Sequence, residues 1–207
     1  MPYTTLISPL ELSQHLDDPD WVIIDARFVL AAPERGEQNY QLNHIPGAQY
    51  VHLDHDLAAP MIPGKTGRHP WLSVEAAARV FSRLGIDERV QVVIYDDAGG
   101  ALAAVRMWWT LRWLGHEAAA LLDGGWQGWV YQELPVRPGI ESRPPRQFTP
   151  RTVRSELLVD IDYVDRIRQD PAYRLLDARA AERYQGKNET IDPVAGHIPG
   201  ALSAPYM

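Results

Sequence analysis

Two short strings recur in this chain in the same order, and the repeat sets the limits on its fold. Asp-Ala-Arg stands at residues 25–27 and again at 177–179, while His-Ile-Pro-Gly-Ala stands at 44–48 and again at 197–201. The offset of about 150 residues is the length of a domain and far exceeds the period of a solenoid or propeller repeat. The sequence therefore predicts two copies of one domain, the second represented by its beginning.

The pattern within the first copy alternates strands and helices. Ser8, Pro9 and Glu11 form a helix start with a capping box, and Ser73 caps a second helix. Buried strands are predicted at 21–24, 90–95 and 118–122, with a further helix ending near Gly115, an irregular loop at 28–41, a short strand at 50–51 and a turn at 123–126. This alternation is typical of an α/β domain with a central, mostly parallel sheet flanked by helices.

Three segments follow from the repeat and from local composition. Residues 1–134 form the first domain, and the proline-rich stretch 135–154 is a plausible linker. Residues 155–207 form the opening part of the second domain, in which Asp160 caps a helix.

Composition excludes several classes of protein. Of the 207 residues, 45% are hydrophobic and 23% charged, and the formal net charge is −7 without any dense Lys/Arg tract. Nucleic acid and anionic membranes are therefore not expected partners. The chain has neither a basic, apolar leader nor a membrane-length apolar run, so we expect a cytoplasmic protein.

The sequence contains no cysteine. Disulfides, thiolate metal sites and a cysteine nucleophile within these residues are thereby excluded.

The repeated strings, together with Val93-Ile94-Tyr95-Asp96 and Leu122-Asp123-Gly124-Gly125-Trp126, resemble the tandem rhodanese family of sulfurtransferases, which act on thiosulfate or 3-mercaptopyruvate. The resemblance covers nearly the whole chain. It implies a parallel α/β domain repeated in tandem, with a catalytic cysteine in the second copy only and with no cofactor or metal. It also implies a cysteine persulfide that takes sulfane sulfur from a small anionic donor and passes it to cyanide or a thiol acceptor.

In that family the cysteine follows the strand equivalent to 92–95, a position that Asp96 occupies here. A carboxylate cannot accept sulfane sulfur, so the resemblance implies a catalytically silent first domain. The repeat offset places the second-copy counterpart beyond residue 207. We therefore expect the 207-residue chain to be inactive alone.

Asp96 and Asp97 leave two interpretations open. Paired acids after a strand are typical of a metal-dependent hydrolase or an aspartyl nucleophile. The alternative, which we favour, is that they cap the helix that begins near Ala101.

Arg183 resembles the family arginine that binds the anionic end of the donor, and Ala31 stands at the same distance after the first Asp-Ala-Arg. A guanidinium suits such oxyanions, although a surface ion pair is the alternative. Mercaptopyruvate-type members of that family carry a further arginine between this segment and His-Ile-Pro-Gly, so its absence from 187–196 implies, through the resemblance, thiosulfate as donor.

His69 is the second candidate for substrate binding, because the family places its loop near the active cleft; a solvated loop histidine is the alternative. His44 and His197 are expected to fix their turns by hydrogen bonds to backbone. Asp25 and Asp177 are expected to organise the following loops.

A silent rhodanese-like domain that binds a partner protein or an anion is the competing function. The incomplete second copy is also expected to expose apolar surface and unpaired strand edges, which predicts loose order or self-association.

Overall fold

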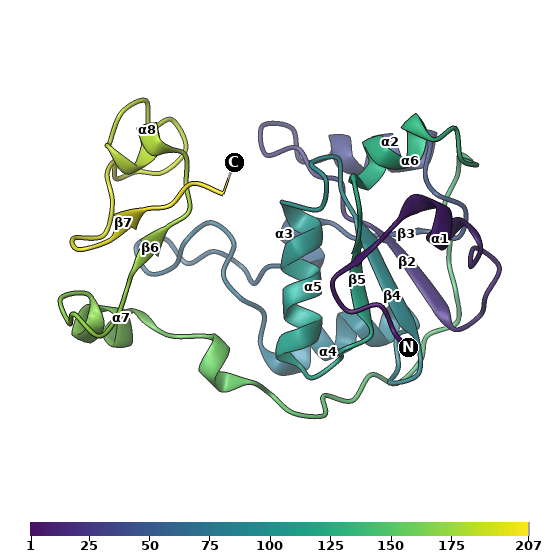
Figure 1. Ribbon diagram of the computed structural model, residues 1–207, viewed down its shortest axis with the longest axis horizontal. Coiled ribbons are helices and arrows are strands. Elements are labelled where there is room, and N and C mark those ends of the chain that lie inside the picture. Colours follow the sequence, from purple (N-terminus) through teal and green to yellow (C-terminus); the bar gives the residue numbers. More distant parts are fainter. Residues whose placement is uncertain (207) are drawn as a thin grey trace. The chain divides into compact units, whose positions relative to one another are not determined.

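The computed structural model describes residues 1–206 and separates into two compact units, residues 1–154 and residues from 155 onward (Figure 1). Each unit is described by itself.

The first unit is built on a five-stranded sheet in which all neighbouring strands are parallel. The strand order is β1-β5-β4-β2-β3. The strands are β1 (Leu6–Ile7), β2 (Trp21–Asp25), β3 (Gln49–Tyr50), β4 (Gln91–Tyr95) and β5 (Ala119–Leu122). The predicted parallel α/β domain is confirmed.

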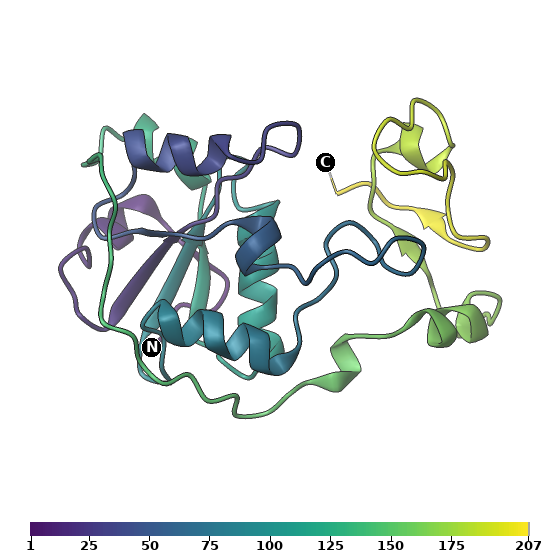
Figure 2. The same cartoon turned by 180° about the vertical axis from the view of Figure 1, so that it is seen from behind.

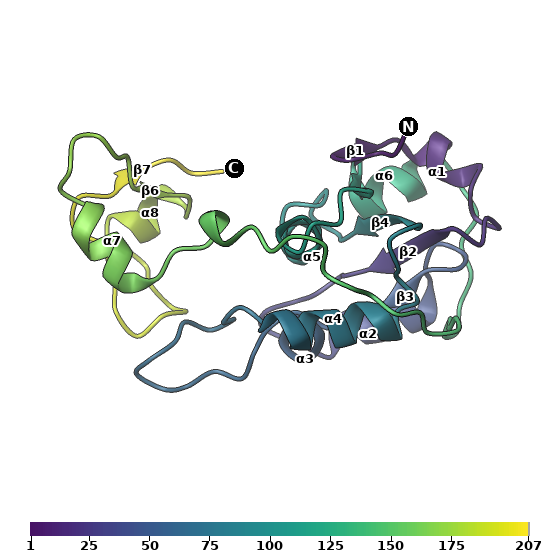
Figure 3. The ribbon, with the colours of Figure 1, turned by 90° about the horizontal axis from the view of Figure 1, so that it is seen from below.

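Six helices surround this sheet. They are α1 (Pro9–Ser13), α2 (Arg35–Leu42), α3 (Leu53–Asp56), α4 (Val74–Arg83), α5 (Ala103–Trp113) and α6 (Gly125–Tyr131). In Figure 2 the helices α2, α3 and α4 face the viewer, and Figure 3 shows them beside the β3 edge, with α1 and α6 beside β1. Helix α5 packs on β4 and β5, and the strands β2 and β4 are buried nearly throughout, so both faces of the sheet are covered, as the continuous apolar strands require.

The central strand β4 is buried along its whole length. Val93 and Tyr95 join a core cluster with Ile23 of β2 and Trp129 of α6. Because both faces of β4 are covered, residues 92–95 form a continuous apolar run that does not alternate with polar residues.

The predicted helix starts at Ser8 and Ser73 are confirmed. Ser8 accepts a hydrogen bond from Glu11 N–H, and the Glu11 carboxylate accepts one from Ser8 N–H, which completes the capping box. Ser73 Oγ accepts from Ala76 N–H at the start of α4.

One prediction was wrong: the predicted loop 28–41 contains most of α2. The turn predicted at 123–126 is present at 123–124, and helix α6, which the sequence did not predict, begins at Gly125. Helix α2 buries only Gly36 and Tyr40, so it lacks an apolar stripe that could be read from sequence. A Cβ at Gly36 would lie 2.1 Å from the carbonyl oxygen of Arg27, so tertiary contact explains this glycine in the first turn of the helix.

The stretch 135–154 has no helix or strand of its own but packs along the first unit. Phe148 is buried, and Arg143 donates from Nη1 to the carbonyl oxygen of Trp21 over 2.6 Å. The compact unit therefore extends to Arg154, beyond the expected boundary at 134.

The second unit is small, and its two strands pair in parallel. Its elements are a 3-10 turn η1 (Ser155–Leu157), α7 (Ile161–Ile167), β6 (Leu176–Asp177), α8 (Ala181–Tyr184) and β7 (Leu202–Ser203). Asp160 caps α7 as predicted.

The second unit leaves large apolar side chains exposed, as expected. The most exposed include Ile161, Leu176, Val194, Ile198 and Leu202. Within residues 1–206, β6 pairs with β7 alone, whereas its repeat counterpart β2 is flanked on both sides. The predicted apolar surface and open strand edge are therefore present.

Among residues 1–206, every helix is too short or too polar to cross a lipid bilayer.

Candidate functional site

The loop that follows β4 wraps backbone amides around one carboxylate. Asp96 Oδ1 accepts hydrogen bonds from Ala98 N–H at 2.9 Å and from Gly100 N–H at 2.8 Å. Its Oδ2 accepts from Leu102 N–H at 3.0 Å and from Ala104 N–H at 3.1 Å. Four converging donors form a cradle for one negative charge at the entry to α5.

Asp96 is 1% exposed, so its carboxylate is enclosed within this cradle. The predicted capping role of Asp96 is confirmed, because Leu102 is the N-cap of α5 and Ala104 lies in the first turn of that helix. A carboxylate already bound by four amides has no oxygen free for a metal or for nucleophilic attack. The hydrolase interpretation of Asp96 therefore finds no support in the site.

Glycines give this loop its shape. Gly99 and Gly100 have φ angles of +67° and +88°, a region that side chains rarely enter. Gly125, at the start of α6, lies so close that a Cβ there would meet the Asp96 carbonyl oxygen at 2.5 Å. The Asp96 carbonyl accepts a hydrogen bond from Trp126 N–H. Helix α6 thus closes the loop from behind.

A buried ion pair lies at the end of the neighbouring strand β2. The Arg27 guanidinium donates to both carboxylate oxygens of Asp25, with Nη2 at 2.7 Å from Oδ2 and Nε at 3.1 Å from Oδ1. Arg27 also donates to the carbonyl oxygen of Asn43 and lies 4.2 Å from the centre of the Trp126 ring. Asp25 therefore organises the following loop, as predicted.

Burial and charge set the protonation of this network. Burial raises the pKa of the Tyr95 hydroxyl well above its ordinary value, and the neighbouring Asp25 charge adds to the effect. Burial alone would lower the pKa of Arg27, but the hydrogen bonds and charge of Asp25 raise it. Arg27 therefore stays charged and Tyr95 keeps its proton, so both side chains donate to Asp25 and hold the ends of β2 and β4 together.

His44 fixes its turn from a fully buried position. Its Nδ1 lies 2.8 Å from the Tyr40 carbonyl oxygen, and its ring stacks on Tyr40 at 4.4 Å between ring centres. Nε2 contacts Glu141. This is the predicted turn-holding role.

His69 pairs with an acid on α3. Its Nε2 lies 2.9 Å from Asp54 Oδ1, and both line a cavity of about 550 Å³ with Phe28 and Met61. Burial, together with the charges of Arg106 and Arg68, lowers the pKa of His69 below its ordinary value although Asp54 raises it, so the ring is neutral at pH 7. The structure thus places His69 in a cavity, apart from the Asp96 loop.

The second unit repeats the Asp25 and His44 geometry with its own residues. Arg179 donates to both oxygens of Asp177 and to the carbonyl oxygen of Gly196. His197 Nδ1 lies 2.8 Å from the carbonyl oxygen of Tyr184. The duplication read from sequence therefore extends to individual hydrogen bonds.

Arg183 is held by two carboxylates. It donates from Nε to Glu189 at 3.0 Å and from Nη2 to Asp192 at 2.6 Å. The backbone N–H of Asp192 and the Arg183 side chain lower the pKa of Glu189 to about 2. These hydrogen bonds involve Nε and Nη2 of the guanidinium.

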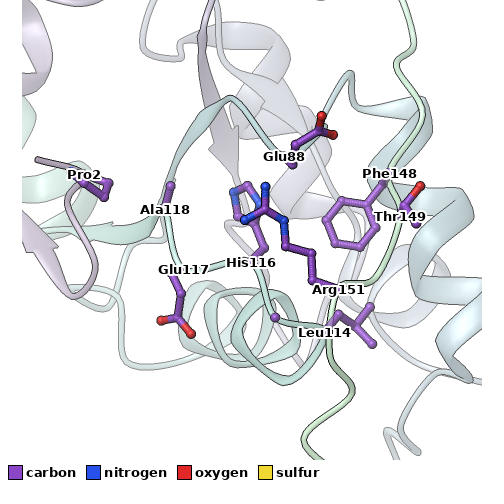
Figure 4. A pocket seen from close by; sticks show the side chains of 10 residues that line it. Pro2, Glu88, Leu114, His116, Glu117, Ala118, Phe148, Thr149 and Arg151 are labelled. Atoms are coloured by element: carbon purple, nitrogen blue, oxygen red, sulfur yellow. The ribbon is translucent and has the colours of Figure 1, made fainter.

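In the first unit, a cavity of about 200 Å³ lies at the amino-terminal ends of β4 and β5, whereas the Asp96 loop follows the carboxyl end of β4 (Figure 4). His116 and Phe148 line it, with Glu88 and Arg151 among the charged residues. Ligands of parallel α/β sheets bind at the carboxyl ends of strands, so this cavity is not the candidate site.

Sequence reasoning found Asp25, Arg27 and Asp96 but missed Tyr95 and Trp126 as their partners. Both stand in the quoted motifs, yet only the strand register brings Tyr95 opposite Asp25.

The family described as rhodanese-like domain matches residues 8–132. A *Pseudomonas aeruginosa* protein named probable 3-mercaptopyruvate sulfurtransferase is 43% identical over 97% of this chain and 70% of its own length. A *Rattus norvegicus* protein named thiosulfate sulfurtransferase is 28% identical over 99% of this chain and 70% of its own.

Solved structures agree with these relatives. The crystal structure of SseA from *Escherichia coli*, described among 3-mercaptopyruvate sulfotransferases, superimposes with a TM-score of 0.83 at 30% identity. The match covers 98% of this chain and 75% of SseA.

Proposed function

Because this chain belongs to the rhodanese family of sulfurtransferases, we propose that it serves the transfer of sulfane sulfur from thiosulfate or 3-mercaptopyruvate to cyanide or a thiol acceptor. The amide cradle after β4 is the observation that carries the proposal. A ring of backbone N–H groups at a helix start lowers the pKa of a thiol placed there and stabilises a thiolate or persulfide.

In the first unit the cradle holds Asp96, which cannot carry sulfur. The reaction therefore depends on a cysteine that these 207 residues do not contain. In the proposed double displacement, the thiolate attacks the outer sulfur of thiosulfate, or the thiol sulfur of 3-mercaptopyruvate, and forms a persulfide as the S–S or C–S bond of the donor breaks. Thiosulfate leaves sulfite, and 3-mercaptopyruvate leaves the enolate of pyruvate, whose carbon takes up the proton of the donor thiol. The acceptor then takes the outer sulfur and regenerates the thiolate.

Arg183 is the proposed anion-binding residue. Glu189 and Asp192 hold the guanidinium plane in one orientation through Nε and Nη2. The N–H groups of Nη1 can then meet a sulfonate or carboxylate oxygen. His69, neutral and bonded to Asp54, is the second proposed substrate contact.

We also propose a domain organisation for the chain. A silent rhodanese-like domain is followed by a connecting stretch that packs on it and by the first part of a second rhodanese-like domain.

The exposed apolar residues of the second unit support self-association as a further proposal. Light scattering of the purified chain tests it, and a monodisperse monomer at high concentration would contradict it.

The test of function uses a chimera. The 207 residues are joined to the residues that follow the matched region in the *P. aeruginosa* relative, and both forms are assayed with each donor and cyanide. We expect turnover in the chimera and none in the 207-residue chain. The Arg183→Gln change in the chimera should lower kcat/KM at least about tenfold, with Arg174→Gln as the matched control.

Two results would overturn this assignment. Turnover by the 207-residue chain would show that no cysteine is needed, and an inactive but folded chimera would favour the alternative, a non-catalytic binding module. One observation supports this alternative: all four amide N–H groups of the cradle already donate to the Asp96 carboxylate.

A further inference from the structure

Three side chains near α2 and α3 form a cluster that the proposed reaction does not use. Glu34 stands at the N-cap of α2, His52 at the N-cap of α3, and His55 within α3. Figure 2 shows both helices on the same side of the first unit. One carboxylate oxygen and one ring nitrogen from each histidine lie within 4.8 Å of one another.

His52 is the fixed member of this cluster. It is 6% exposed, and its Nε2 is buried without a hydrogen-bond partner in residues 1–206. Its backbone N–H donates to Asp56 Oδ2, and its Nδ1 accepts from Asp54 N–H over 3.2 Å. A buried polar atom without a partner costs about 1–3 kcal/mol, so an unfilled Nε2 points to a missing partner.

Glu34 and His55 are exposed and can adjust. The Glu34 carboxylate makes no capping hydrogen bond to α2 despite its position there. His55 stacks on His52 with 4.3 Å between ring centres. All three residues line one cavity of about 580 Å³, which gives an ion and its water ligands access.

We propose that Glu34, His52 and His55 bind a divalent transition-metal ion of the zinc type. Two imidazole nitrogens and one carboxylate are ligands that Zn²⁺ takes in proteins, and water completes a tetrahedral site. Ligand atoms around such an ion lie roughly 3.4 Å apart. The two exposed side chains therefore turn inward, and His55 rotates out of its stack on His52, while His52 stays in place.

Coordination through His52 Nε2 requires the ring proton to stand on Nδ1. The Asp54 N–H then exchanges its 3.2 Å bond for water. This N–H belongs to the first turn of α3, where amide donors have no helical acceptor and water commonly serves. Asp56 is not a fourth ligand, because it bonds His52 N–H and Arg83.

Calorimetric titration of ZnCl₂ into the tag-free, chelator-treated 207-residue protein tests the site. The chain has no cysteine, so thiolates cannot account for tight zinc binding. We expect one ion per chain in the micromolar range. Glu34→Gln and His55→Gln should each weaken binding at least about 10-fold, because loss of a direct ligand should cost no less than loss of a residue that only orients one.

The matched control is His15→Gln, because His15 also neighbours an acid, Asp18, but stands outside the cluster. Its affinity for Zn²⁺ should equal that of the unchanged protein. Circular dichroism establishes that the exposed variants fold. In parallel, ¹⁵N NMR of the imidazoles should show the His52 proton moving to Nδ1 when Zn²⁺ binds.

Several results would overturn the proposal. Binding weaker than about 100 μM would do so, as would full affinity in both cluster variants. An equal loss in His15→Gln, or a His52 ring that does not respond to Zn²⁺, would also contradict it.

Discussion

The hydroxyl group of Tyr95 donates a 2.7 Å hydrogen bond to Asp25 Oδ2, and the two residues are register partners at the carboxyl ends of β4 and β2. The bond ties the strand that leads into the Asp96 loop to the strand that carries the Arg27 ion pair. It holds a fully buried carboxylate in place between two adjacent strand ends.

Removal of that hydroxyl should destabilise the first unit. Tyr95→Phe leaves Asp25 with one donor fewer and removes the acceptor of Ile45 N–H. We expect the free energy of unfolding in urea to fall by about 1–3 kcal/mol, the cost of an unmet buried polar group. Tyr131→Phe, at an 89% exposed position, is the control and should change little.

The Asp96 carboxylate should contribute to stability through its four amide donors. Asp96→Asn replaces one acceptor oxygen by an NH₂ group that faces N–H groups, so we expect a loss of about 1–3 kcal/mol in urea unfolding. Asp97→Asn keeps the loop donors satisfied and serves as control. Equal stability of both variants would argue against the cradle.

The same cradle should activate a thiol. Asp96→Cys places sulfur among the amides that now bind the carboxylate, and such surroundings lower a cysteine pKa from about 8.5. We expect alkylation by iodoacetamide to persist at pH 6. Ala98→Cys, in the same loop, should react only as an ordinary thiol does, and similar pH profiles for the two would count against the prediction.

The pH dependence of stability should report His116. Burial lowers the pKa of this 6% exposed ring below its ordinary value of about 6.5. The unfolded chain therefore binds a proton first, so the His116 contribution is present above about pH 6.5 and is lost as pH falls through the folded value. Thermal unfolding from pH 8 to 5 should show a steeper fall than in His116→Gln.

Glu189 offers a direct titration. Its pKa of about 2 means that its stabilising contribution is complete above the ordinary value near 4.5 and is lost as pH falls toward 2. Carboxyl ¹³C NMR should place its midpoint near 2, and Arg183→Gln should raise it. A midpoint unchanged by that substitution would mean that Arg183 does not pair with Glu189 in solution.

How much the sequence predicted depends on the range of the interaction. The capping box at Ser8, the N-caps at Ser73 and Asp160, the apolar strands and the duplicated strings are local patterns, and each appears in the structure where it was expected. Helix α2 was missed because its burial comes from Gly36 and Tyr40 alone. Only contact with Arg27 and Tyr50 makes that glycine necessary.

The sequence by itself determined the α/β class, the duplication and the absence of a thiol, since these follow from residue order and composition. The tertiary structure decided which side chains meet. Strand register places Tyr95 against Asp25, and the packing of α2 beside α3 brings Glu34 to His52 and His55. These contacts join separate elements of secondary structure, and no local pattern encodes them.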